Sequence, residues 1–335
     1  MIGWINFIAY SLFVLWVLVE AQLIFGLTGL PWYIQIFYYG GLHFGILVLS
    51  FFVLRGIWLQ FLFSPPKITR LKADFTPEMF KIPYEKVEIT SSDGVILRGW
   101  FIPSRKENHK QLSQKGTIIV CHGITSSRYF QLPRSIFFHT LGYNILLMDL
   151  RAHGDSDGKY VTFGFKEQFD IEASVQYIKN RKDIYNKKIA LVAHSMGGAT
   201  GILYTAVHSD IQALIVLSCY SSIEEDMAYW ITRIARLPKY PFVYFGKKLF
   251  RDGVGVELDT IDPINYINEV KIPVFFIHGK EDEVSHYSSS ERLYTKANAP
   301  KELWLVDGAA HETIYETAGR EFEHRLRDFL HKYFD

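Results

Sequence analysis

The stretch Ile189–Gly198, which reads IALVAHSMGG, decides the fold. Its apolar residues up to Ala193 predict a buried strand, and Gly197 to Val207 predict a helix. A sharp turn between them would lift the Ser195 hydroxyl above a sheet and aim the helix N-terminus at it. Ser195 is therefore a candidate nucleophile, and the alternative interpretation is a purely structural turn.

The chain around this stretch repeats the same alternation. After Pro65 and Pro66, short apolar or β-branched runs alternate with amphipathic segments, which predicts an α/β fold: a mostly parallel eight-stranded sheet flanked by helices. We expect strands at Lys86–Thr90, Val95–Ile102, Thr117–Cys121, Ile145–Leu150, Ile189–Ala193, Ala213–Ser218, Val274–His278 and Glu302–Val306. The clearest expected helices are Phe165–Lys179, Gly197–Val207 and Ala318–Tyr333. Ser91–Gly94 predicts a hairpin turn between the first two strands.

One interval interrupts the alternation. About fifty residues separate the strand ending at Ser218 from the strand starting at Val274, which is too long for a structureless loop. We expect a small helical lid at about 221–262. Its aromatic residues would either line a pocket for an apolar substrate or simply pack the lid on the body; they are Tyr229, Trp230, Tyr240, Phe242, Tyr244, Phe245 and Phe250.

A serine nucleophile needs a base, and the base needs an orienting acid. The strand ending at His278 opens into an acidic loop, where Asp282 is the candidate acid. Glu281 and Glu283 remain rivals, and a solvated acidic turn is the alternative. The last strand opens into a loop of small residues ending at His311, the candidate base.

The oxyanion of an acyl-transfer intermediate needs two hydrogen-bond donors. The backbone amide of Met196, directly after the serine, is the first candidate. The second is the amide of Ile124, in the loop after the strand Thr117–Cys121. His122 in the same loop is interpreted as a buried hydrogen-bonding brace rather than as a base.

These landmarks occur in the order that is typical of one superfamily. The chain resembles α/β-hydrolases over about residues 85–334. The motifs that carry the resemblance are Cys121-His122-Gly123, Asp149 to Ser156 (DLRAHGDS), His194 to Gly198, His278-Gly279-x-x-Asp282 and Gly308-x-x-His311. The closest resemblance is to the monoacylglycerol-lipase-like, serine-aminopeptidase-like and acyl-protein-thioesterase-like branch. Ala193 and Ala152 stand where the family commonly has glycine. The resemblance implies ester, thioester or amide hydrolysis through an acyl-enzyme, without a metal or organic cofactor.

The first 63 residues predict a membrane anchor. Residues 4–25 and 32–54 are apolar and long enough for two transmembrane helices, and the alternative is one span plus an interfacial helix. Arg55 and the cluster Lys67, Arg70 and Lys72 follow the second span, so the catalytic domain is expected on the cytoplasmic side. Residues 64–84 would be a linker and 85–335 the catalytic domain. Glu20 and His43 lie in the spans and receive no role.

Composition excludes several other classes of protein. A formal net charge of +1 gives no field for binding nucleic acid. Two cysteines, each at the end of a buried strand, favour free thiols over a disulfide. The metal motifs His-Glu-x-x-His and the complete calcium loop are missing from the sequence. The leading hypothesis is an esterase, lipase or thioesterase for lipid-like acyl substrates. A peptidase or amidase on the same triad, or a non-catalytic membrane-tethered binding protein, are the alternatives.

Overall fold

The computed structural model describes residues 29–63, 75–104, 106–107, 110–111, 115–234, 236, 238–298 and 300–335. The chain divides into two compact units, Met1–Trp58 and Leu59–Asp335. The predicted span 4–25 lies outside the described residues, and the predicted span 32–54 falls on helix α2 (Trp32–Phe63). Among the described residues, no helix is both long and apolar enough to cross a membrane. The predicted transmembrane hairpin is therefore not supported by the structure.

The eight-stranded, mostly parallel sheet predicted from the sequence is confirmed. Its strand order is β1-β2-β6-β5-β7-β8-β9-β10. The pairs β1/β2 and β2/β6 are antiparallel, and the remaining pairs are parallel. Each predicted strand is present to within two residues at either end. The strands are β1 (Glu85–Thr90), β2 (Ile96–Ile102), β5 (Thr117–Cys121), β6 (Asn144–Met148), β7 (Ile189–His194), β8 (Ala213–Leu217), β9 (Val274–Gly279) and β10 (Lys301–Val306). A short hairpin, β3 (Lys106–Glu107) with β4 (Lys110–Gln111), was not predicted.

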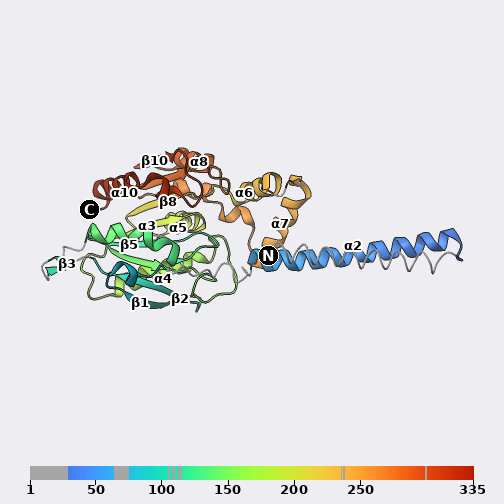
Figure 1. The fold of residues 1–335 in the computed structure, drawn as a ribbon, viewed down its shortest axis with the longest axis horizontal. Coiled ribbons are helices and arrows are strands. Elements are labelled where there is room, and N and C mark those ends of the chain that lie inside the picture. Colours follow the sequence, from blue (N-terminus) through green and yellow to red (C-terminus); the bar gives the residue numbers. More distant parts are fainter. Residues whose placement is uncertain are drawn as a thin grey trace. The chain divides into compact units, whose positions relative to one another are not determined.

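Helices cover both faces of the sheet (Figure 1). The central strands are buried on both faces because parallel strands in such folds are covered on each side. Alternate strand residues therefore enter two separate cores. One core contains residues of α4 (Glu167–Asn180), α5 (Met196–Val207) and α8 (Ser288–Lys296). The other contains residues of α3 (Arg128–Thr140) and α10 (Arg320–Tyr333). The 3₁₀ turn η2 (Pro77–Phe80) precedes β1, and the short helix α9 (Ile314–Ala318) precedes α10.

The segment 221–262 is helical. It contains α6 (Ile223–Tyr229), the π-helical turn η3 (Trp230–Ile234), α7 (Lys239–Val254) and the 3₁₀ turn η4 (Leu258–Ile261), followed by η5 (Pro263–Asn265) and η6 (Ile267–Glu269). Its aromatic residues differ in exposure, and Tyr229 and Trp230 are half-buried. Phe250 is buried and packs against Phe163, whereas Tyr240, Phe242, Tyr244 and Phe245 are exposed. Packing of the lid on the body therefore accounts for Phe250 and not for the exposed rings.

A buried ion-pair network supports the loop after β6. Arg128 contacts Asp149 and lies 2.5 Å from Asp155, and its guanidinium stacks 4.7 Å from the ring centroid of Trp100. Burial raises the pKa of Asp149 to about 6, although Arg128 opposes that rise. Ala152, in the same loop, has a φ of +61°, a conformation that favours glycine.

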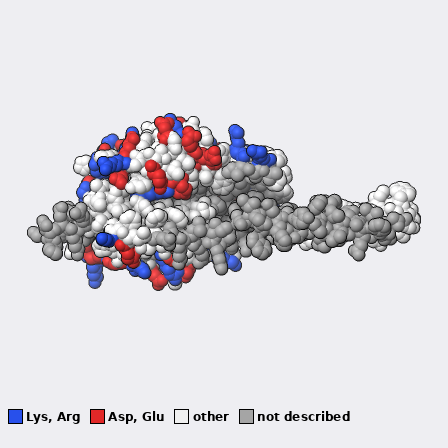
Figure 2. Space-filling model, in the orientation of Figure 1, with Lys and Arg blue, Asp and Glu red and all other residues white. Residues whose placement is uncertain are grey.

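The surface of the described residues carries both signs of charge. In the view of Figure 2, Lys and Arg side chains are interspersed with Asp and Glu over the unit Leu59–Asp335. Exposed ion pairs among the described residues include Arg98 with Glu88 and Lys332 with Glu302. Such exposed pairs contribute little to stability.

Candidate active site

Ser195 occupies a strained turn between β7 and α5. Its φ of +53° and ψ of −118° are unusual for a residue with a side chain and are typical of a nucleophile elbow. Small neighbours make room for the turn, because a Cβ on Gly197 would lie 2.7 Å from the carbonyl oxygen of His122. A Cβ on Gly123 would lie 2.9 Å from the Cβ of Ser195. Ala193, which replaces the usual glycine, is accommodated in a fully buried position.

The structure brings the three sequence-predicted side chains together. Nε2 of His311 lies 3.0 Å from Oγ of Ser195, and Nδ1 of His311 lies 2.7 Å from Oδ2 of Asp282. These residues follow three different strands, β7, β9 and β10, at the carboxyl edge of the sheet. Ser195 and Asp282 are buried, and the His311 side chain is 11% exposed. This relay can move a proton from the serine hydroxyl to an imidazole held by a carboxylate.

The Asp282 carboxylate is surrounded by donors. Its Oδ1 accepts hydrogen bonds of 2.9 Å from the amides of Val284 and Ser285, and Nε2 of His278 lies 3.1 Å from Oδ2. Burial works to raise the pKa of Asp282, but the hydrogen bonds from His278 and His311 outweigh it and hold the pKa below its ordinary value. The carboxylate is therefore ionised at neutral pH. Its rivals Glu281 and Glu283 are exposed.

The two candidate oxyanion donors flank Ser195. Met196 is the first residue of α5 and is buried, and Ile124 follows Gly123 in the loop after β5. His122 braces this loop: its Nε2 accepts the Leu150 amide at 2.9 Å, so its Nδ1–H donates to the Gly123 carbonyl at 2.7 Å. Since carbonyl and amide point in opposite directions across a trans peptide, the Ile124 amide faces away from His122. Burial lowers the pKa of His122 well below its ordinary value.

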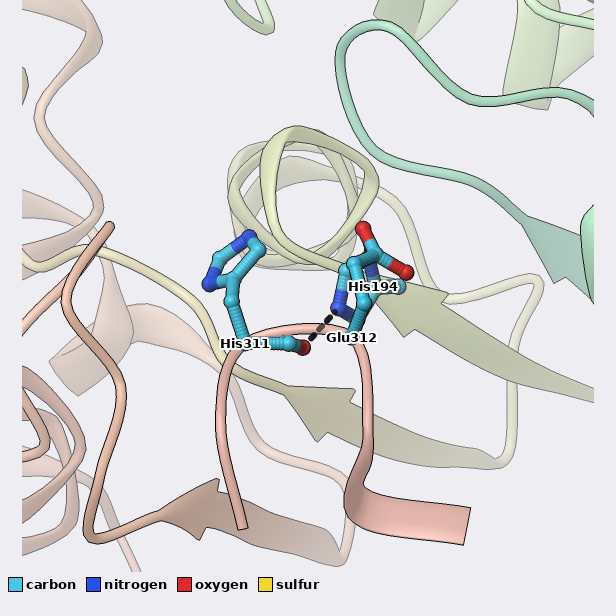
Figure 3. Close-up of side chains that lie close together, drawn as sticks. All are labelled: His194, His311 and Glu312. Carbon is cyan, nitrogen blue, oxygen red and sulfur yellow. Dashed lines mark hydrogen bonds and ion pairs between the residues drawn. The ribbon is translucent and has the colours of Figure 1, made fainter. Parts of the chain in front are cut away.

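Sequence reasoning missed two residues that lie beside the relay. His194 is buried, and its Nε2 donates a 2.9 Å hydrogen bond to the carbonyl of His311 (Figure 3). Glu312 is held by Arg134, whose Nη1 lies 3.1 Å from Oε2 and whose Nη2 donates to the Glu312 carbonyl. Their position in the sequence could have pointed to them, because His194 directly precedes Ser195 and Glu312 directly follows His311.

The lid contributes a buried acid near the same relay. Asp226 in α6 is 5% exposed. Burial raises its pKa to about 7, and the charge of Asp282 adds to the rise. A contact links the segment 221–262 to the loop that carries Asp282, because Nε1 of Trp230 donates a 2.6 Å hydrogen bond to the carbonyl of Val284.

Comparison with known proteins identifies the family. The family model for the alpha/beta hydrolase fold matches residues 116–244, and the model for serine aminopeptidase, S33, matches residues 262–318. The structure of an esterase from Pyrococcus furiosus is similar at 30% sequence identity and a TM-score of 0.67, covering 82% of this chain and 99% of that chain. The chain belongs to the α/β-hydrolase superfamily.

Two curated relatives extend this comparison. The uncharacterized protein YqkD of Bacillus subtilis is 32% identical over 216 residues, which are 64% of this chain and 70% of that protein. The alpha/beta hydrolase domain-containing protein WAV2 of Arabidopsis thaliana is 28% identical over 315 residues, 90% of this chain and 96% of that protein. With its fold and its esterase neighbours, the chain is a hydrolase.

One group of side chains in the described part of this α/β-hydrolase is close enough to share a metal ion. His194, His311 and Glu312 each offer one ligand atom, and these atoms lie within 4.8 Å of one another. The relay itself needs no metal, because serine, imidazole and carboxylate complete the proton transfer.

Proposed function

We propose that the chain is a serine esterase that cleaves carboxylic ester or thioester bonds of lipid-like acyl substrates. The observation that carries this proposal is the continuous relay from Oγ of Ser195 through the His311 imidazole to Asp282, at 3.0 and 2.7 Å. The similarity to the Pyrococcus furiosus esterase supports an ester over other acyl bonds.

The proposed reaction has two halves. Oγ of Ser195 attacks the acyl carbonyl carbon while Nε2 of His311 takes the hydroxyl proton, and Asp282 stabilises the imidazolium. The bond to the leaving alcohol or thiol breaks, and His311 returns the proton to it, which leaves an acyl ester on Ser195. Water then attacks this ester with His311 as base, and the carboxylic acid is released. The amides of Ile124 and Met196 would hold the oxyanion in both halves.

A second candidate is a peptidase or amidase on the same relay. The match of residues 262–318 to a serine aminopeptidase model favours it. Both candidates use the same nucleophile and base, and the leaving group is selected by the lid and loops rather than by the relay.

The test is hydrolysis of p-nitrophenyl acyl esters, acyl-CoA thioesters, monoacylglycerol and aminoacyl amides by the detergent-purified full chain. Ser195→Ala and His311→Ala are the inactive controls. We expect ester or thioester turnover and fluorophosphonate labelling, both lost in Ser195→Ala. Turnover of amides alone would favour the peptidase. If no substrate turns over and the probe does not label Ser195, the chain is a binding protein and the proposal is wrong.

We also propose, from the sequence pattern alone, that residues 1–63 anchor the enzyme in a membrane, with the catalytic domain on the cytoplasmic side. The apolar segments 4–25 and 32–54 and the basic residues that follow them support this. The test is alkaline carbonate extraction of membranes that contain the full chain. Retention in the pellet, with protection of the catalytic domain from external protease in intact cells, is expected. Release into the supernatant would refute the anchor.

A further inference from the structure

The imidazole of His194 presents an unpartnered nitrogen inside the site. Because its Nε2 bonds to a carbonyl oxygen, which can only accept, the proton lies on Nε2 and Nδ1 carries a lone pair. In the described part of the chain this buried Nδ1 has no hydrogen-bond partner. It faces Oε1 of Glu312 at 3.7 Å. His194 is buried and Glu312 is half exposed, so the Glu312 carboxylate borders solvent while the His194 lone pair does not. A buried acceptor that faces a carboxylate is unfavourable unless a positive species lies between them.

The spacing of these atoms suits a transition-metal ion. Zn²⁺ binds imidazole nitrogen at about 2.0–2.1 Å and carboxylate oxygen at about 2.0–2.2 Å, with tetrahedral angles. Two such ligand atoms lie roughly 3.3–3.5 Å apart, so the observed 3.7 Å between Nδ1 and Oε1 needs a shift of only a few tenths of an ångström. Imidazole with carboxylate is a donor set for Zn²⁺ rather than for Mg²⁺ or Ca²⁺, which prefer oxygen ligands.

The third ligand comes from the base of the relay. The rings of His194 and His311 are 4.9 Å apart between centroids, and Figure 3 shows the His311 imidazole standing beside His194 and Glu312. Both nitrogens of His311 are already engaged, Nδ1 with Asp282 and Nε2 with Ser195. An ion that takes His311 as a ligand must therefore break one bond of the relay.

The charges around the site both oppose and favour a cation. Arg134 opposes it, but its guanidinium binds Oε2 of Glu312 and leaves Oε1 to face His194. The ring proton of His194 lies on Nε2, which donates to the His311 carbonyl, so Nδ1 offers a lone pair. A lone pair on imidazole nitrogen and a carboxylate oxygen are groups that bind a metal.

We propose that His194, Glu312 and His311 form a Zn²⁺ site whose occupancy switches the hydrolase off by withdrawing His311 from the relay. The inhibitory consequence rests on the proposed esterase function, whereas binding of the ion does not. Zinc and an intact relay are mutually exclusive, and a chelator restores activity.

Binding is measured by calorimetric titration of the untagged full chain with ZnCl₂, in a Ser195→Ala background that removes one competitor for His311. We expect one Zn²⁺ per chain and no binding of Mg²⁺ or Ca²⁺. Glu312→Gln should weaken Zn²⁺ binding by at least about 10-fold, the least that loss of support for a metal site costs. The matched control is Glu316→Gln, which removes a carboxylate 3.5 Å from the same Arg134 but lies outside the ligand group.

Inhibition is then measured with the ester substrate, relative to the zinc-free rate of each variant. Zn²⁺ should block both turnover and fluorophosphonate labelling in the wild-type chain, with Glu312→Gln at least about 10-fold less sensitive than Glu316→Gln. Equal zinc affinity in the two variants would overturn the site, as would the absence of saturable binding. So would a proton found on Nδ1 of His194 at neutral pH by NMR. If zinc binds as expected but no ester is hydrolysed, the esterase proposal fails while the binding site stands.

Discussion

Replacing Asp282 by Asn is the sharpest test of the relay, because the change keeps the shape of the side chain and removes its charge. The two oxygens of Asp282 together face four donors: the amides of Val284 and Ser285 at Oδ1, and His311 and His278 at Oδ2. Asparagine offers one oxygen and one NH₂ group. Whichever way it turns, the NH₂ group meets two donors.

These contacts set the loss of stability and of catalytic rate in Asp282→Asn. An unpaired buried donor costs about 1–3 kcal/mol, so two of them cost about 2–6 kcal/mol. If the NH₂ group faces His311, the imidazole shifts its proton to Nε2, and a protonated Nε2 accepts no proton from Ser195. The lost charge-assisted hydrogen bond to the imidazolium adds to the barrier. We therefore expect kcat to fall by about 10³–10⁴-fold, which corresponds to about 4–5.5 kcal/mol.

The assay is kcat and kcat/KM for a p-nitrophenyl ester, with thermal unfolding to show that Asp282→Asn still folds. Glu281→Gln and Glu283→Gln are matched controls, since they remove the same charge from exposed neighbours of Asp282. Both controls should keep kcat within about 3-fold of the wild-type value, as is usual for exposed substitutions. The reasoning is refuted if Asp282→Asn keeps more than a tenth of the activity, or if either control loses as much.

Three further predictions concern buried groups. Burial raises the pKa of Asp226 to about 7, so the folded chain keeps this proton up to that pH while the unfolded chain loses it near pH 4, and stability falls as pH rises between these values. Asp226→Asn should therefore raise the free energy of unfolding more at pH 8 than at pH 5, by about 2.7 kcal/mol, and equal gains in denaturant unfolding would contradict this. Gly154 has a φ of +47° and a Cβ there would overlap the Asp149 carboxylate, so Gly154→Ala should lower the free energy of unfolding by more than about 3 kcal/mol. The control Gly94→Ala, at a φ of +84° in open space, should lower it by about 1 kcal/mol, and similar melting temperatures of the two variants would contradict this. Arg128→Gln leaves Asp149 buried without its countercharge and should destabilise the fold by about 3–5 kcal/mol, with a smaller loss below pH 6, where Asp149 is protonated.

The strands could be predicted because burial on both faces leaves a continuous apolar run. Thr117–Cys121 and Ala213–Leu217 are fully buried and read as strands without reference to any neighbour. Helices were expected between the strands, but α3 was not among the clearest, because it contains Pro133 and buries polar residues such as Arg128 and Gln131. The bounds of α8 were not predicted either, because it begins with three serines and its burial depends on contacts that only the fold provides.

Some residues of the candidate site could likewise be predicted from local sequence, and others could not. Ser195 and His311 could be picked from local sequence because a strand, a turn of small residues and a functional side chain follow in order. Asp282 was the predicted acid, with Glu281 and Glu283 as rivals, and only the structure shows that Asp282 is the carboxylate buried beside His311. The contacts of Glu312 with Arg134 and His194 join residues more than 100 positions apart in the chain, and no local pattern contains them.

The sheet order explains why His311 needs these contacts. Ser195 follows β7, but His311 follows β10, and β8 and β9 lie between them. The loop that carries His311 must therefore reach back across two strands. It is held by the loop after β9, because the Glu281 amide donates to the Ala309 carbonyl at 2.9 Å. The two loops pack so closely that a Cβ on Gly279 would overlap that carbonyl.

At its far end the same loop is held by His194, which binds the carbonyl of His311 and thereby turns its own Nδ1 toward Glu312. The hydrogen bond that positions the base thus also places the two facing acceptors of the proposed zinc site. Removing His194 would disturb both the relay and the ion, whereas Glu312 bonds to neither Ser195 nor Asp282 among the described contacts. Glu312 is therefore the position at which metal binding can be changed separately from proton transfer.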